Sequence, residues 1–129
     1  MKYPVAVWAD NDGFSAEVPD LPGVITEADS IEELSENIEE ASLGWMEAEL
    51  DEGRNIPKPT SVETHMQNPA YQNCIWLLVE INLNKLSDKV ERLNICLPSR
   101  VIRRLDSLAK KSGESRSGYL AKIIYGLAP

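Results

Sequence analysis

The chain has 129 residues, of which 43% are hydrophobic and 26% charged, as expected for a soluble globular protein of one domain or two small ones. No apolar run reaches the ~18 residues of a membrane span, and the N-terminus lacks the apolar core of a signal peptide, so we expect a cytoplasmic protein. Cys74 and Cys96 are expected to be two separate thiols, as in a reducing compartment, and a disulfide between them is the alternative. No cluster of Cys and His has metal-ligand spacing, so the sequence predicts neither a metal nor a cofactor.

The net charge of −8 conceals an asymmetry between the two ends of the chain. Residues 1–87 carry 17 Asp/Glu and 4 Lys/Arg, a net charge of −13, whereas residues 88–129 carry 4 and 9, a net charge of +5. Such a split predicts two modules with different partners. The basic module can approach phosphate, while the acidic module is better suited to a basic protein.

The N-terminal module begins with a predicted β-hairpin. Residues 5–9 form a short apolar strand, residues 10–13 a turn, and residues 14–18 an alternating, half-buried strand. Residues 19–23, with two prolines and a glycine, break this strand. Residues 24–28 predict a third, short strand.

A long amphipathic helix follows the third strand. Ser30 and Glu33 form a capping box, in which the hydroxyl and the carboxylate each accept a hydrogen bond from a free backbone amide. Apolar or small residues then recur at steps of three and four and predict one buried stripe, on a helix that ends near Gly53. The stripe comprises Ile31, Leu34, Ile38, Ala41, Trp45 and Ala48.

The second half of the N-terminal module contains a polar connection and a strand. Residues 54–73 are rich in proline and polar side chains and predict an irregular connection, in which His65 is expected to be exposed and inert. Residues 75–81 are almost continuously apolar and predict a strand buried on both faces, which completes a β-β-β-α-β order. The tryptophans are expected to lie in the core rather than to form a binding platform: Trp8, Trp45 and Trp76.

The C-terminal module predicts one strand and two helices after a linker at residues 83–88. Residues 90–97 form the strand, and the first helix starts at Pro98-Ser99 with Ser99 as its N-cap. Gly113 follows the first helix, and Ser115 caps the second. A unit of about 42 residues cannot hold a core alone, so we expect dimerisation to be close to obligatory.

The predicted strand of this module alternates between a core face and a polar face. Leu93, Ile95 and Leu97 point one way, toward helices from two chains, and Arg92, Asn94 and Cys96 point the other way. A two-stranded antiparallel ribbon fits the DNA major groove, where Arg can bond to guanine and Asn to adenine. Cys96 offers a weaker apolar contact to a thymine methyl group. The alternative is a strand that serves only for dimerisation.

The start of the second helix predicts a contact to DNA phosphate. Ser115, Arg116 and Ser117 place two hydroxyls, a cation and free backbone amides together. Three segments, Arg92–Pro98, Leu105–Ala109 and Gly113–Ser117, resemble the ribbon-helix-helix family of bacterial repressors. The resemblance covers about a third of the chain and implies base reading by the three polar strand residues, although a cysteine at the third position is unusual.

The N-terminal module resembles HicB antitoxins in Phe14–Gly23, Thr26 and the Ser30–Glu33 cap. The resemblance implies an α+β protein: a β-β-β-α-β, degraded RNase H-like domain at residues 1–86 and a ribbon-helix-helix (β-α-α) dimerisation domain at residues 87–129. It implies a HicA-type, mRNA-cleaving ribonuclease toxin as partner, occluded by the first domain, and repression of the protein's own operon at palindromic operator DNA. It further implies a homodimer through residues 88–129 and leaves a tetramer open. The candidate toxin contacts are Asp20, Leu21 and Pro22.

Two other functions deserve comparison. A nuclease would need Mg²⁺ ligands such as Asp10, Asp12, Glu17 and Asp20, but Asp residues are common in turns for conformational reasons, so we predict that the protein is not an enzyme. A stand-alone DNA-binding regulator with a ligand-sensing or assembly domain is the main alternative. An apolar pocket in the acidic domain would favour that alternative.

Overall fold

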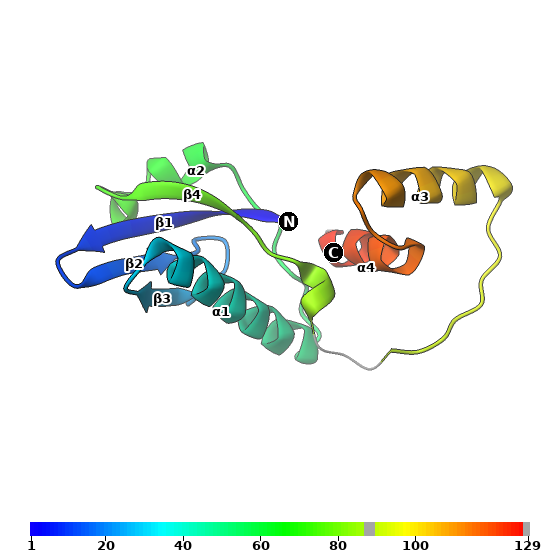
Figure 1. Cartoon of the computed structure of the whole chain (residues 1–129), viewed down its shortest axis with the longest axis horizontal. Coiled ribbons are helices and arrows are strands. Elements are labelled where there is room, and N and C mark those ends of the chain that lie inside the picture. The colour runs from blue at the N-terminus through cyan, green and yellow to red at the C-terminus, as the bar shows by residue number, and fades with distance from the viewer. Residues whose placement is uncertain (87–89, 128–129) are drawn as a thin grey trace.

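The computed structural model describes residues 1–86 and 90–127 and contains a four-stranded antiparallel sheet and four α-helices (Figure 1). The strand order in the sheet is β3-β2-β1-β4. The strands are β1 (Lys2–Asp10), β2 (Gly13–Glu17), β3 (Ile25–Ala28) and β4 (Ile75–Glu80). The helices are α1 (Ile31–Asp51), α2 (Val62–Met66), α3 (Ser99–Lys111) and α4 (Arg116–Gly126), with 3-10 turns η1 (Pro69–Tyr71) and η2 (Leu83–Lys85). These elements confirm the predicted β-β-β-α-β order of the N-terminal module.

A tight turn at Gly13 closes the predicted hairpin. Asp10 pairs with Gly13 across the hairpin, and the Asp12 amide donates to Asp10 Oδ1 at 2.8 Å. Gly13 has a φ of +138°, and a Cβ atom here would lie 2.5 Å from the carbonyl oxygen of Ala28 in β3. Only glycine satisfies both the backbone angle and this close approach.

Helix α1 covers one face of the sheet, and the serine half of its predicted capping box is confirmed. The Ser30 hydroxyl accepts a hydrogen bond from the Glu33 amide at 3.2 Å, and the helix ends two residues before Gly53. The buried positions are Leu34, Ile38, Ser42 and Met46. The predicted stripe is confirmed at Leu34 and Ile38, and Ala41 and Trp45 are half-buried against the core, but the two ends of the stripe, Ile31 and Ala48, are exposed. Every fourth residue is buried, so the contact line turns slowly around the helix instead of following steps of three and four.

Strand β4 lies at the edge of the sheet, which corrects the prediction that it is buried on both faces. It pairs with β1 alone, and Ile75 and Leu78 are 58% and 62% exposed. An apolar run looks the same in a sequence whether a strand has one neighbour or two. The connection before β4 is also more regular than predicted, because it contains α2 and η1.

Helices α3 and α4 form a hairpin whose turn was predicted correctly. Gly113, at φ +68°, follows α3, and the Ser115 hydroxyl caps α4 by accepting from the Gly118 amide at 3.0 Å. The N-cap of α3 is Pro98 rather than Ser99, which is the first helical residue. Helix α4 also contacts residues 1–86, because Tyr125 packs against the hydrophobic core between the sheet and α1.

Residues 90–98 are not a strand in the single chain, contrary to the prediction for residues 90–97. They run as an unpaired stretch to the start of α3 (Figure 1). A strand needs a neighbour to accept and donate its backbone hydrogen bonds, and the described residues of this chain offer none here. Within the two described ranges, no helix is long and apolar enough to cross a membrane.

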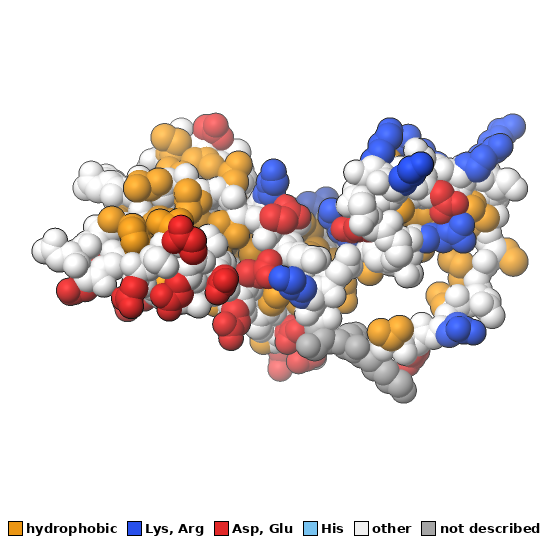
Figure 2. All heavy atoms as spheres, viewed as in Figure 1, with side chains coloured by type: hydrophobic (Ala, Val, Ile, Leu, Met, Phe, Trp, Pro, Cys, Tyr) orange, Lys and Arg blue, Asp and Glu red, His pale blue; other side chains and the backbone are white. Residues whose placement is uncertain are grey.

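Figure 2 shows that charge is segregated between the two parts. Carboxylates line the side of the sheet part that carries α1, whereas lysines and arginines gather on α3. The segregation in space follows the segregation along the sequence.

Candidate functional site

The unpaired residues 90–98 expose an apolar series and a polar series side by side. The predicted base-reading residues Arg92, Asn94 and Cys96 are all exposed. Leu93 and Ile95, between them, are 78% and 58% exposed. Two large apolar side chains at alternate positions are unfavourable in water, so this stretch has the properties of an interface.

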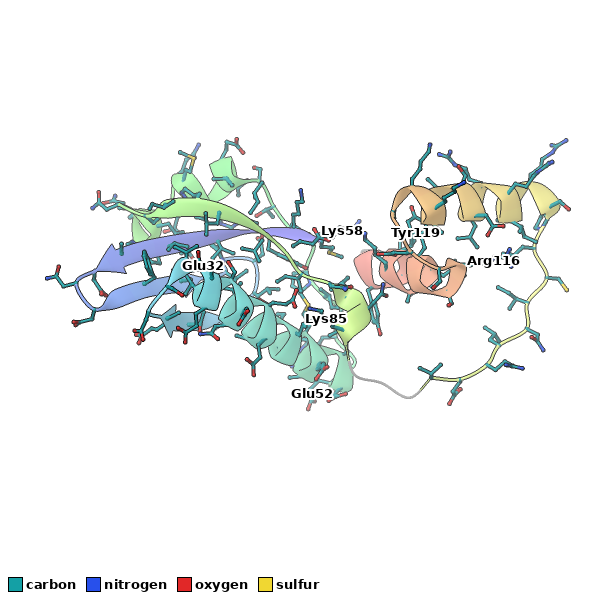
Figure 3. The ribbon with its side chains drawn as sticks, in the orientation of Figure 1. Glu32, Glu52, Lys58, Lys85, Arg116 and Tyr119 are labelled. Carbon is teal, nitrogen blue, oxygen red and sulfur yellow. The ribbon has the colours of Figure 1, made fainter. Side chains whose placement is uncertain are left out.

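An apolar groove lies between α3 and α4, next to the exposed series. It has a volume of about 370 Å³ and includes Leu97, the last apolar residue of the stretch. Tyr119 projects from α4 into the space between the helices (Figure 3). The other apolar residues that line the groove are Val101, Leu105, Leu108, Leu120 and Ile123. The groove and the stretch together form one apolar surface on the C-terminal part.

The structure brings the three predicted phosphate-binding residues together at the start of α4, but it gives Arg116 a partner. The Arg116 guanidinium donates to both carboxylate oxygens of Asp106 in α3, at 2.8 and 2.9 Å. This hydrogen bonding holds the pKa of Asp106 below its usual value. Ser115 caps the helix and lies 3.5 Å from the Ser117 hydroxyl. A phosphate at this position would therefore share Arg116 with Asp106.

A basic surface on α3 was not identified from the sequence. Its side chains are exposed, and none is paired with a carboxylate within residues 1–86 and 90–127. They are Arg100, Arg103, Arg104, Lys110 and Lys111 (Figure 2). Their spacing opposite the apolar positions of α3 was the signal that could have revealed them.

The three candidate toxin contacts differ in accessibility. Leu21 is fully buried, and the Asp20 side chain is only 6% exposed. Asp20 accepts hydrogen bonds from the Thr60 amide at 2.9 Å and the Thr60 hydroxyl at 2.7 Å. Only Pro22 is exposed. Asp20 and Leu21 thus shape this loop, and Pro22 is the candidate that a partner can reach.

The side chain of His65 is largely buried and makes polar contacts, which corrects the expectation that this residue is exposed. Its Nε2 atom lies 2.6 Å from the Thr60 hydroxyl and 3.1 Å from Asp20 Oδ1, and its side chain is 15% exposed. The ring stacks on Trp76 of β4, with ring centres 6.1 Å apart. Contacts to residues so distant along the chain could not be seen in the local sequence.

The side chain of Tyr3 in β1 contacts the segment that connects α1 to β4. This contact predicts that the protein loses stability at alkaline pH. The Tyr3 hydroxyl donates to the Pro57 carbonyl at 2.6 Å, and burial, with a smaller effect of Asp20, raises its pKa to about 12. The folded state therefore holds this proton more tightly than the unfolded state, in which the pKa is about 10. The contribution of the Tyr3 hydroxyl to the free energy of unfolding should be fully present below pH ~10 and should be lost as the pH rises toward 12.

The test of this limit compares the wild-type chain with Tyr3→Phe by urea unfolding at a series of pH values. At neutral pH the variant should lose about 0.5–1.5 kcal/mol, the net value of one hydrogen bond. Above pH ~10 its stability should fall less steeply than that of the wild type. Parallel pH profiles would show that another group sets the limit.

The carboxylates considered for a nuclease site have separate roles. Asp10 and Asp12 lie at the hairpin turn, beside an open, polar cleft of about 400 Å³. Glu17 accepts from the Tyr71 hydroxyl at 3.3 Å, and Asp20 binds Thr60. In the described parts of the chain, no group of three or more His, Cys, Asp or Glu is placed to hold a metal ion.

The comparisons with known proteins agree over almost the whole chain. The family model described as HicB-like antitoxin of bacterial toxin-antitoxin systems matches residues 3–124. A 14.9 kDa protein from the rep-hol intergenic region of Haemophilus phage HP1 (strain HP1c1) is 30% identical over 125 residues, covering 95% of this chain and 94% of that protein.

Solved structures give the same result. The crystal structure of the Burkholderia pseudomallei antitoxin HicB is similar with a TM-score of 0.82 and 31% identity, covering 97% of this chain and 96% of that one. A chain of a HicA3 and HicB3 toxin-antitoxin complex is similar with a TM-score of 0.54 and 28% identity, covering 63% of this chain and 98% of that one. This chain therefore belongs to the HicB-like antitoxin family of bacterial toxin-antitoxin systems.

Proposed function

We propose that this protein is an antitoxin whose residues 1–86 bind and occlude a HicA-type, mRNA-cleaving ribonuclease toxin. The observation that carries the proposal is the similarity to a chain of the HicA3 and HicB3 toxin-antitoxin complex, which covers 63% of this chain. The net charge of −13 over residues 1–87 supports it, because carboxylates can occupy the electrostatic place of phosphates on an RNA-binding protein. Inhibition by occlusion requires no catalytic group on the antitoxin.

Residues 87–129 form the second unit of the proposal, a ribbon-helix-helix domain that dimerises and binds operator DNA. Pairing of residues 90–97 with the same residues of a second chain would cover Leu93 and Ile95 and give this stretch its missing backbone partner. The ribbon would then present Arg92, Asn94 and Cys96 to the major groove. A two-fold dimer implies a palindromic operator, and binding there would repress the protein's own operon.

A growth experiment tests the antitoxin role. We expect that inducing the adjacent gene for a small basic protein arrests growth, and that supplying this chain from a second plasmid relieves the arrest. Residues 1–86 alone should relieve it as well. Because a shortened chain can fail to fold, soluble expression of residues 1–86 with a cooperative thermal transition is the necessary control.

Two outcomes would contradict the proposal. Growth without arrest, or arrest that the full chain does not relieve, would favour a stand-alone DNA-binding regulator with a sensing or assembly domain. The cleft beside the hairpin turn gives that alternative little support, because carboxylates of Asp10, Glu27 and Asp29 line it together with Phe14 and Ala28.

A further inference from the structure

Arg116 differs from the other cations of the C-terminal part because a carboxylate holds it in one orientation. Its Nε atom donates to Asp106 Oδ1 at 2.8 Å, and its Nη2 atom donates to Asp106 Oδ2 at 2.9 Å. Lys122 has a single, longer contact, at 3.6 Å to Glu114. The other lysines and arginines of residues 90–127 have no carboxylate of the described residues within ion-pair distance. The planar guanidinium of Arg116 is therefore fixed in direction, whereas these other cations can rotate.

The hydrogen bonds to Asp106 use only one edge of the Arg116 guanidinium. The Nη1 atom and the second N–H group of Nη2 form another edge, and Nη1 has no hydrogen-bond partner in residues 1–86 and 90–127. The Arg116 side chain is 59% exposed. A phosphate can therefore reach this second edge and bind it through parallel hydrogen bonds while Asp106 keeps the first edge.

The pair between Asp106 and Arg116 contributes little to holding α3 and α4 together. The Asp106 side chain is 47% exposed, and an ion pair between two side chains as exposed as these contributes little to stability, because water and salt screen the charges. The two helices also meet through the apolar residues that line the groove between them, among them Leu105 and Leu120. The main effects of the pair are thus on the direction and on the net charge of the Arg116 side chain.

We propose that Asp106 is a specificity-determining residue for DNA binding, which acts by positioning Arg116 and neutralising it at the same time. The inference rests on the proposed binding of operator DNA by residues 87–129. DNA of unrelated sequence is held by net positive charge, to which a neutralised Arg116 adds little. On the operator, base contacts fix where each phosphate lies, and the oriented guanidinium gains directional hydrogen bonds to one of them. Asp106 therefore weakens binding to unrelated DNA more than binding to the operator.

Binding of the full chain to two DNA duplexes tests the proposal. One duplex carries the promoter region of the protein's own operon, and the other has the same length and an unrelated sequence. Asp106→Asn should raise the affinity for the unrelated duplex and increase its slope against salt by about one charge. The preference for the promoter duplex should fall by about three- to tenfold, since one released charge at ~0.1 M salt changes the affinity by up to about tenfold.

The matched control is Glu114→Gln. It removes a carboxylate close to Arg116 in the sequence, and this carboxylate contacts Lys122 rather than Arg116. The net charge changes by the same amount, so the affinities for both duplexes should rise together and the preference should stay the same. Circular dichroism and thermal transitions equal to those of the wild type would show that each variant is folded.

A double-mutant cycle shows whether Asp106 acts through Arg116. In a chain that already carries Arg116→Ala, Asp106→Asn should leave the preference for the promoter duplex unchanged. If the preference falls equally in both backgrounds, Asp106 acts by its own charge and the inference is overturned. It is also overturned if Asp106→Asn keeps the full preference of the wild type. A wild-type chain that does not distinguish the two duplexes would instead contradict the proposed operator binding itself.

Discussion

Replacing Leu21 by alanine should lower the free energy of unfolding by about 2–5 kcal/mol, the usual cost of removing a buried leucine side chain. Leu21 is fully buried in the core cluster that contains Val18 and Val24. Its backbone is fixed on both sides, since its amide donates to the Val18 carbonyl and its carbonyl accepts from the Val24 amide, each at 3.0 Å. The loop therefore cannot collapse easily into the cavity. Chemical denaturation of the full chain measures the loss.

Pro22→Ala is the matched control for this substitution. Pro22 is exposed, so its replacement should change stability by less than about 1 kcal/mol, chiefly through the unfolded chain. The two variants also separate structure from contact. If Leu21→Ala were as stable as the wild type but failed to neutralise the toxin, Leu21 would be a toxin contact and its burial would not reflect the free protein.

The double variant Arg92→Ala, Asn94→Ala should bind operator DNA no better than unrelated DNA. A bidentate contact between a side chain and its base contributes about 1–3 kcal/mol of discrimination, so two lost contacts remove most of the preference. Binding to both DNAs measured at several salt concentrations gives the preference and the number of phosphate contacts together.

The salt dependence is the internal control of this experiment. The variant keeps the cations of α3 and α4, so the slope of affinity against salt should fall by no more than about one charge. Toxin neutralisation should be unchanged, because both substituted residues lie in the C-terminal part. Loss of neutralisation would contradict the division of labour between residues 1–86 and 87–129.

The features that the sequence predicted correctly depend on neighbouring residues. Ser30 and Ser115 cap helices through amides three residues further along, and Gly113 takes the positive φ that ends α3. Periodicity and apolar runs also identified the four strands of the sheet and the long helix. These signals are contained in windows of a few residues, so one chain without relatives is enough to read them.

The features that it missed depend on distant partners. His65 meets Asp20 across 45 positions, and Arg116 meets Asp106 across 10. The apolar run of β4 was predicted to be a central strand because the residue pattern does not indicate how many strands lie beside it. Residues 90–97 show the opposite case, in which a strand pattern has no neighbouring strand in the part of the chain that the structure describes. In each case the local sequence does not show which distant residue or strand is the contact partner.

The separation of charge seen in Figure 2 gives the molecule a large electric dipole moment, with its positive pole at α3 and its negative pole at α1. In the field of a polyanion such a molecule rotates before it touches, so that the positive pole leads. At physiological ionic strength the screening length is about 8 Å, so this torque acts only over the last stage of an encounter. A collision with DNA would thereby be biased toward the basic end, and the acidic end would stay available to a cationic protein.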